Sequence, residues 1–229
     1  MTDKLTISAE QADRLFWLGR YVERVYLTLK LFNNTLDAMI DEDAQSRIED
    51  FCERLSIPSY IYAGADDFET RYLFDEANPD SLYSNLSRAY DNAIILRNFI
   101  TSESLSFVQM ALDRLHEGKV SQSAFLETQQ VADWLLAFWG SIEETVLNPE
   151  RRDLLKVGKY VEHIDLVIRL EQPYEILTRM LPRLESRVSH VSALLQTDKL
   201  QALHEIASDE TVYEANRKKA LALINSLHC

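Results

Sequence analysis

Apolar residues recur at alternating steps of three and four along the first forty residues of the chain. This seam predicts one long helix from about Ser8 to Ile40, and its members are Leu15, Leu18, Val22, Val25, Leu29, Phe32 and Leu36. Phe16, Leu27 and Leu31 form a second apolar stripe on the nearly opposite side. A helix that is apolar on two sides is expected to lie between two layers of other helices.

Helical spacing continues along the rest of the chain and is broken at proline, glycine and capping residues. We expect helices at about 43–56, 80–100, 101–116 and 121–147, and another after the Asn148-Pro149 start signal. Two or three more should follow Pro173, interrupted by Pro182 and by residues 207–210, whereas 59–79 is less regular. The pattern predicts an all-α bundle of seven to nine helices, and the absence of a linker predicts a single domain over residues 1–229.

The composition agrees with an all-α fold and argues against some classes of function. Glycine and proline number only five each, too few for the turns of a β-rich fold. Aspartate and glutamate outnumber lysine and arginine by 37 to 24, and the formal charge of -13 does not suit binding to nucleic acid or to an anionic membrane. With no apolar run long enough to span a bilayer and only two cysteines, we expect a cytoplasmic protein.

An internal repeat with a spacing of 139 residues is the most informative feature of the sequence. Aligning residues 15–31 with 154–170 gives seven identities in 17 positions. The shared Gly-(Arg/Lys)-Tyr-Val-Glu block includes glycine and polar positions that amphipathicity does not require. We therefore predict that the long core helix is duplicated.

Charged residues of both copies fall within the apolar stripes. Arg20, Glu23 and Arg24 occur in the first copy, and Lys159, Glu162 and His163 in the second. Gly19 and Gly158 lie one turn before the two glutamates. A glycine inside a helix costs about 0.5 to 1 kcal/mol relative to alanine, so these two predict either close helix packing or room for a small ligand.

Four blocks of sequence occur in a fixed order: ADRLFWLGRYVER at 12–24, LFDEANPDSL at 73–82, SRAYDNAIILR at 87–97 and LKVGKYVEHID at 155–165. In order and spacing they resemble the bacterial Alpha-E family, a helical domain named for its Glu-Arg motif. The resemblance spans residues 5 to 171 and adds Arg88 and Asn92 to the candidate binding residues. It departs from the family pattern at Lys159 and at His163, where the second motif reads Glu-His.

The resemblance implies partners rather than a reaction. Genes of the family typically neighbour circularly permuted ATP-grasp ligases and transglutaminase-like proteins, which implies a role in making or modifying peptide or amide bonds. We therefore expect an accessory or substrate-handling protein that acts with an ATP-grasp ligase. The alternative is a stand-alone enzyme that uses the paired glutamates, and a homo-oligomer of helical bundles stays open as well.

The candidate binding residues have two interpretations. Glu23 and Glu162 can project into one shared pocket as acid and base, or can be paired with neighbouring cations in a network that fixes helix register, which we favour. Arg20, Arg24 and Arg88 can form an anion-binding cluster, or can be paired with Glu23, which is the simpler interpretation. Because His163 stands where the family pattern has arginine, we expect its imidazole to titrate near neutral pH.

The sequence carries no signature of a cofactor or a metal. No glutamate has a histidine three residues on, as a di-iron bundle requires, and nucleotide-binding glycine patterns and nucleophile motifs are absent. We therefore expect no metal and no cofactor in this chain, so that an ATP site, if one is needed, belongs to a partner.

Overall fold

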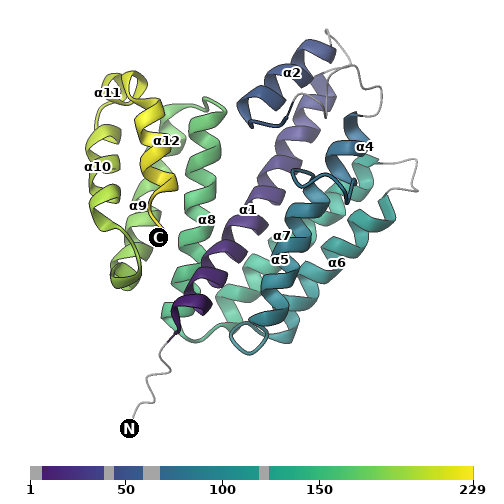
Figure 1. The fold of residues 1–229 in the computed structure, drawn as a ribbon, viewed down its shortest axis with the longest axis horizontal. Coiled ribbons are helices and arrows are strands. Elements are labelled where there is room, and N and C mark those ends of the chain that lie inside the picture. The colour runs from purple at the N-terminus through teal and green to yellow at the C-terminus, as the bar shows by residue number, and fades with distance from the viewer. Residues whose placement is uncertain (1–6, 39–43, 59–67, 119–123, 229) are drawn as a thin grey trace.

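Every regular element of the protein is helical in the computed structural model, which describes residues 7–38, 44–58, 68–118 and 124–228 (Figure 1). The predicted all-α fold is confirmed. The α-helices in these ranges are α1 (Ala9–Ala38), α2 (Ala44–Arg54), α4 (Phe68–Leu73), α5 (Leu82–Ile95), α6 (Ser102–Gly118), α7 (Ala124–Thr145), α8 (Pro149–Arg169), α9 (Tyr174–Val191), α10 (Thr197–Ala207), α11 (Glu210–Ala215) and α12 (Arg217–Asn225).

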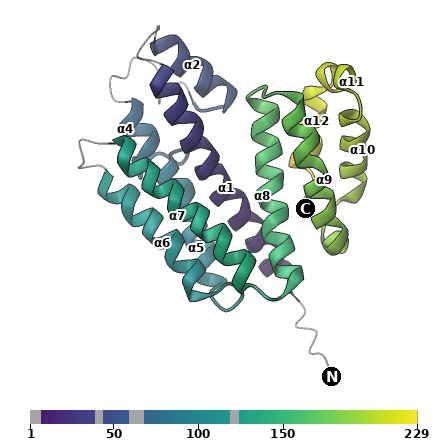
Figure 2. The same ribbon diagram turned by 180° about the vertical axis from the view of Figure 1, so that it is seen from behind.

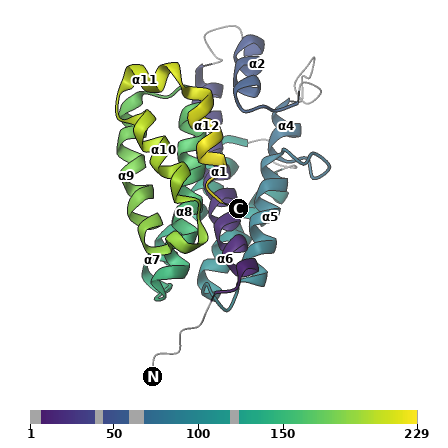
Figure 3. The same cartoon turned by 60° about the vertical axis from the view of Figure 1, so that its left-hand side comes forward.

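Two helices, α1 and α8, form the centre of the molecule and run in the same direction. On one side α5 and α7 pack against α1, and α6 covers α5 and α7 (Figure 2). On the other side α9 and α12 pack against α8, and α10 packs on α9 and α12 (Figure 3). The prediction that the first long helix lies between two layers is therefore confirmed.

The predicted apolar seam of α1 is buried from Leu15 to Phe32, whereas the side chain of Leu36 lies outside the described part of the chain. Leu15, Leu18, Val22, Val25 and Leu29 are completely inaccessible to solvent, and Phe32 is almost so. In the second stripe Phe16 is buried, while Leu27 and Leu31 are partly exposed. Buried apolar residues from both helix groups join in one connected core, which spans the α1–α8 contact.

Capping residues set the starts of several helices where the sequence predicts them. The Ser8 hydroxyl accepts a hydrogen bond from the Gln11 backbone N–H, while the Gln11 side chain accepts one from the Ser8 N–H. Ser81 and Asn148 cap α5 and α8 with their side chains, and Pro149 occupies the first turn of α8. These ends were predictable because each cap satisfies local backbone groups.

The C-terminal region differs from the prediction. Pro182 lies inside α9 and does not interrupt it. Proline removes one hydrogen bond from the helix, but the apolar side of α9, with Leu181, Leu184 and Val188, is buried, and packing against α8 maintains the helix through this position. Four α-helices follow Pro173 instead of two or three.

The described ranges contain eleven α-helices, and the nine that have seven or more residues agree with the seven to nine predicted. The others are the short helices α4 and α11, of six residues each. None of the helices in the described ranges is long and apolar enough to cross a membrane.

Candidate functional site

The two central helices cross in direct backbone contact at a pair of glycines. A Cβ atom added to Gly19 would collide with the carbonyl oxygen of Leu155 on α8. A Cβ atom added to Gly158 would collide with the carbonyl oxygen of Phe16 on α1. Of the two uses predicted for these glycines, close helix packing is the one that the structure shows.

One turn beyond this crossing, Glu162 of α8 accepts hydrogen bonds from two arginines of α1. The Arg20 Nε atom lies 2.7 Å from Oε2, while Arg24 binds both carboxylate oxygens, with Nε 2.6 Å from Oε1 and Nη2 3.1 Å from Oε2. The Glu162 side chain is fully buried, and the Arg20 side chain is 6% exposed. We call Glu162, Arg20 and Arg24 the Glu162 centre.

Also one turn beyond the crossing, but on the opposite face of the α1–α8 contact, Glu23 of α1 contacts two basic residues of α8. Its Oε1 atom lies 2.9 Å from His163 Nδ1, and its Oε2 atom lies 3.8 Å from Lys159 Nζ. The Lys159 ammonium group also lies 4.3 Å from the ring centroid of Trp139 on α7. We call Glu23, Lys159 and His163 the Glu23 centre.

Both glutamates are therefore paired across the helix interface. From the sequence we favoured a network of ion pairs, in which Arg20 and Arg24 pair with Glu23, their neighbour on α1. The structure supports a network but corrects the partners, because both arginines bind Glu162. Residues 23 and 24 are adjacent in sequence and point in different directions around the helix, and the close glycine crossing brings α8 within reach.

The two centres correspond position by position in the 139-residue register. Arg20 and Arg24 match Lys159 and His163, and each pair binds the glutamate of the opposite helix. The glycine contacts are reciprocal in the same register, since Phe16 matches Leu155. This exchange of partners supports the duplication hypothesis, which stays a prediction from the sequence.

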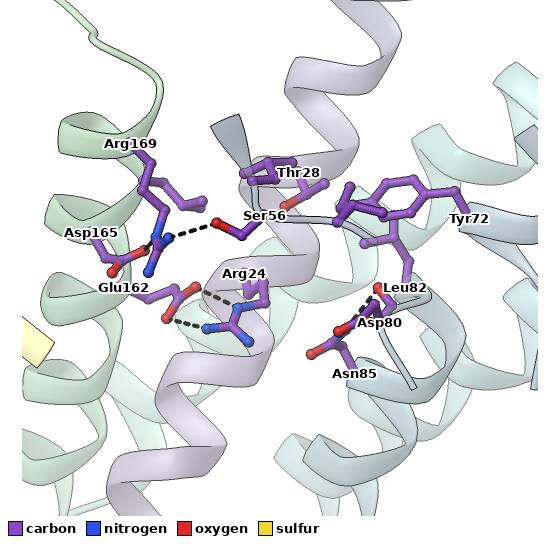
Figure 4. Close-up of a pocket in the computed structure, with 13 residues that line it drawn as sticks. Arg24, Thr28, Ser56, Tyr72, Asp80, Leu82, Asn85, Glu162, Asp165 and Arg169 are labelled. Carbon is purple, nitrogen blue, oxygen red and sulfur yellow. Dashed lines mark hydrogen bonds and ion pairs between the residues drawn. The ribbon is translucent and has the colours of Figure 1, made fainter. Parts of the chain in front are cut away.

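A cavity of about 200 Å³ opens beside the Glu162 centre, between α1, α8, the segment after α2 and the start of α5 (Figure 4). Its charged lining residues are Arg24, Asp80, Glu162, Asp165 and Arg169. Asp165 accepts a hydrogen bond from Arg169 Nε at 2.7 Å, and Asp80 lies across the cavity from this pair (Figure 4). Glu23 does not line this cavity, so the two glutamates do not share it.

The surroundings shift the pKa values of the basic side chains in opposite directions in the two centres. Burial by itself would lower the pKa of Arg24, but the charge and hydrogen bonds of Glu162 raise it above the ordinary value. Burial lowers the pKa of Lys159, and the attraction of Glu23 only partly offsets this effect. The Glu162 centre thus holds permanent positive charge, whereas Lys159 in the Glu23 centre loses its proton more readily.

Two further candidates, Arg88 and Asn92, lie on α5 away from these glutamates. The Arg88 guanidinium lies 6.0 Å from the ring centroid of Tyr21, and the Asn92 side-chain oxygen accepts a hydrogen bond from Arg14. The three-arginine cluster considered for Arg20, Arg24 and Arg88 is not formed. The reason is that α5 packs on a different side of α1 from α8.

Sequence reasoning missed several residues of the cavity. On α8, Asp165 lies one turn and Arg169 two turns after Glu162, and this spacing was a usable signal. Tyr72 and Asp80 reach the cavity from α4 and from the turn before α5, and no local pattern marks them. Asn225 of α12 connects the Glu162 centre to this cavity, because it accepts a hydrogen bond from Arg20 and donates one to Asp165.

The described residues offer few groups for covalent or metal chemistry. In residues 7–38, 44–58, 68–118 and 124–228 no three side chains of His, Cys, Asp or Glu are grouped so that they can hold a metal ion. Cys52 is buried, and burial raises the pKa of its thiol to about 12, so the thiolate nucleophile is not formed near neutral pH.

Comparison with known proteins gives one match. Residues 8–225 match the model of the Alpha-E family, described as a predicted alpha-helical domain with a conserved ER motif. The match covers nearly the whole chain, and Glu23-Arg24 and Glu162-His163 both lie within it. No curated protein and no solved structure matches the chain.

Proposed function

The chain belongs to the Alpha-E family, and on this premise we propose that it is an accessory protein that binds a small polar substrate for an ATP-grasp ligase. In this role it acts in the synthesis or modification of peptide or amide bonds. The partner class rests on the gene neighbourhood of the family. The substrate-handling role rests on the cavity beside the Glu162 centre, which is the observation that carries the proposal.

The cavity offers both hydrogen-bond donors and acceptors to a ligand. In the described part of the chain Arg24 uses Nε and Nη2 on Glu162, and Nη1 makes no hydrogen bond. The Arg24 side chain is 34% exposed, so this N–H group is a donor for a carboxylate or carbonyl oxygen. Asp80 is exposed at the opposite wall and can accept hydrogen bonds from an amine or amide.

These two walls suit a small molecule that carries an amine or amide together with a carboxylate. Free amino acids and their amides have this combination, and they are also substrates or products of amide-bond chemistry. Five charged lining residues make the cavity too polar for an apolar ligand without such groups. The substrate class that we propose is therefore an amino acid or a short peptide.

The alternative of a stand-alone enzyme has less support. Glu162 is held by three N–H groups, and Glu23 is held by His163 at Oε1. A carboxylate fixed in this way is poorly placed to move a proton to or from a substrate. The low reactivity expected for Cys52 removes the described thiol as a nucleophile.

Thermal unfolding in the presence of amino acids, α-amides and dipeptides tests the ligand, because a ligand that binds only the folded state raises the Tm. We expect one of these compounds to raise the Tm of the wild-type protein. Asp80→Asn should weaken its binding about tenfold, because a charge-assisted hydrogen bond is lost. Asp91→Asn is the matched control, since Asp91 is an exposed aspartate of α5 outside the cavity. Equal loss in both variants, or no Tm shift with any compound, contradicts the proposal.

Affinity purification of the tagged protein from its native host, followed by mass spectrometry, tests the partner. Recovery of an ATP-grasp ligase in stoichiometric amount is the expected result. A transglutaminase-like protein would extend the assignment to a second partner. If the protein is recovered alone at normal expression, the accessory role is contradicted even where a ligand of the cavity has been found.

A further inference from the structure

A second cavity, of about 300 Å³, lies between α1, α8 and the start of α9. Its inner wall is apolar, with Leu166 and Val167 each 4% exposed. Two basic side chains, Lys30 and Arg179, line it and are exposed to solvent. His163 of the Glu23 centre also lines it, so this cavity adjoins Glu23 as the first adjoins Glu162.

The two cavities occupy matching positions in the 139-residue register, but their chemistry differs. Arg24 and Thr28 of the first cavity correspond to His163 and Val167 of the second, and Arg169 corresponds to Lys30. The first cavity is lined by three carboxylates and two arginines. The second is lined by two strong cations and a histidine, and no aspartate or glutamate is among its lining residues.

The second cavity is positive although the chain as a whole is acidic. The net charge is -13, so basic side chains have many possible acidic partners. In the described ranges neither Lys30 nor Arg179 forms an ion pair, although eleven other lysines and arginines do. The Lys30 ammonium lies 5.5 Å from the ring centroid of Tyr26, which keeps it near the cavity.

From the apolar wall and the two unpaired cations we propose that this cavity binds a small carboxylate with an apolar body. The apolar part lies against Leu166 and Val167, where its burial supplies most of the affinity. The carboxylate lies at the opening, where Lys30 and Arg179 donate hydrogen bonds to it. This assignment does not depend on the substrate-handling role of the first cavity.

Two sources have this chemistry, a free medium-chain acid and the C-terminal residue of a peptide with an apolar side chain. Octanoate and N-acetyl-leucine are suitable probes for the two. Isothermal titration of the full chain with butanoate, hexanoate and octanoate measures the apolar contribution. Each added methylene that is buried should raise the affinity about fourfold.

The charged contribution is tested with Lys30→Gln and Arg179→Gln. Both side chains are exposed, so the variants are expected to fold, and circular dichroism checks this. Each substitution should weaken octanoate binding about threefold, and the double variant about tenfold. Octanol, which has an alkyl chain and no charge, should bind equally to the wild type and to the double variant.

Lys218→Gln is the matched control, because Lys218 is an exposed lysine on α12 and does not line the cavity. It removes the same charge and should leave octanoate binding unchanged. Tighter binding of octanoate assigns a free acid as the ligand source, and tighter binding of N-acetyl-leucine assigns a peptide terminus. The proposal is overturned if neither probe binds, or if the double variant binds octanoate as tightly as the wild type does.

Discussion

The Glu162 centre and the Glu23 centre have the same arrangement and different chemistry. Each consists of one buried glutamate and two basic residues of the opposite helix, and both lie one turn beyond the glycine crossing. Glu162 is bound by two guanidinium groups through three hydrogen bonds, whereas Glu23 has one hydrogen bond, to His163, and a longer contact to Lys159.

This difference shows that the same helix crossing can hold ion pairs of different strength, depending on the residue types at the matching positions. The crossing of α1 and α8 brings matching positions together, and the residue types at those positions then decide how firmly the charge is held. Guanidinium groups stay protonated in proteins, while lysine and histidine can lose a proton when their surroundings are apolar. The Glu162 centre is thus the more permanent of the two, and the Glu23 centre the more adjustable.

The largest effect is expected from substitutions that disrupt the glycine crossing, which both centres share. Gly19→Ala and Gly158→Ala each place a methyl group where a backbone carbonyl lies, so α1 and α8 must move apart. We expect each substitution to lower the free energy of unfolding by more than about 3 kcal/mol, because backbone cannot give way as a flexible side chain does. Urea-induced unfolding followed by circular dichroism measures the loss.

Gly140→Ala is the control for these two substitutions. A Cβ atom at Gly140 of α7 meets no atom within 4 Å. Alanine should therefore stabilise the protein by about 0.5 to 1 kcal/mol through helix propensity alone. If Gly19→Ala behaves like Gly140→Ala, the close crossing of the two helices is contradicted.

The next largest effect distinguishes the two centres by the free energy of unfolding that is lost when each glutamate is replaced. Glu162→Gln leaves Arg20 almost fully buried without a countercharge, and we expect a loss of about 3 kcal/mol in the free energy of unfolding. Glu23→Gln should cost about 1 kcal/mol, because the Lys159 side chain is 24% exposed and can turn to solvent. Equal losses in the two variants, measured by urea unfolding at pH 7, would show that the centres are energetically equivalent.

A smaller effect comes from making the Glu23 centre resemble the Glu162 centre. His163→Arg creates a second Glu-Arg motif, and its guanidinium can bind both oxygens of Glu23. We expect the free energy of unfolding to rise by about 1 kcal/mol. In the His163→Arg background the guanidinium already pairs with Glu23, so Lys159→Met should lower the free energy of unfolding by less than it does in the wild type. A double-mutant cycle measures this coupling.

The smallest expected effect is a pH dependence that belongs to the Glu23 centre. Burial lowers the pKa of Lys159 below its ordinary value of 10.5, so between the two pKa values the unfolded chain binds the proton and the folded chain does not. The contribution of Lys159 to stability therefore rises as the pH rises through this range, up to about 10.5. The difference in unfolding free energy between wild type and Lys159→Met should follow this slope. A flat difference across the alkaline range would contradict the shift.

Local features of the fold could be predicted from the sequence. The seam of α1, the cap at Asn148 and the helical class depend on periodicity and on backbone hydrogen bonds a few residues apart. The continuation of α9 through Pro182 could not be predicted in this way, because contacts with α8 outweigh the local cost of proline. The short helices α4 and α11 carry too few residues for a periodic signal.

The candidate site was likewise predictable in one respect and not in another. The sequence determined which residues carry charge within the apolar stripes of α1 and α8, since Arg20, Glu23 and Glu162 are all buried as their positions predict. Only the tertiary structure decided their partners, because the choice between Glu23 and Glu162 as the partner of Arg24 depends on how the helices cross. Asp80 joins the cavity for the same reason, since it is far from α1 and α8 in sequence and is brought there by packing.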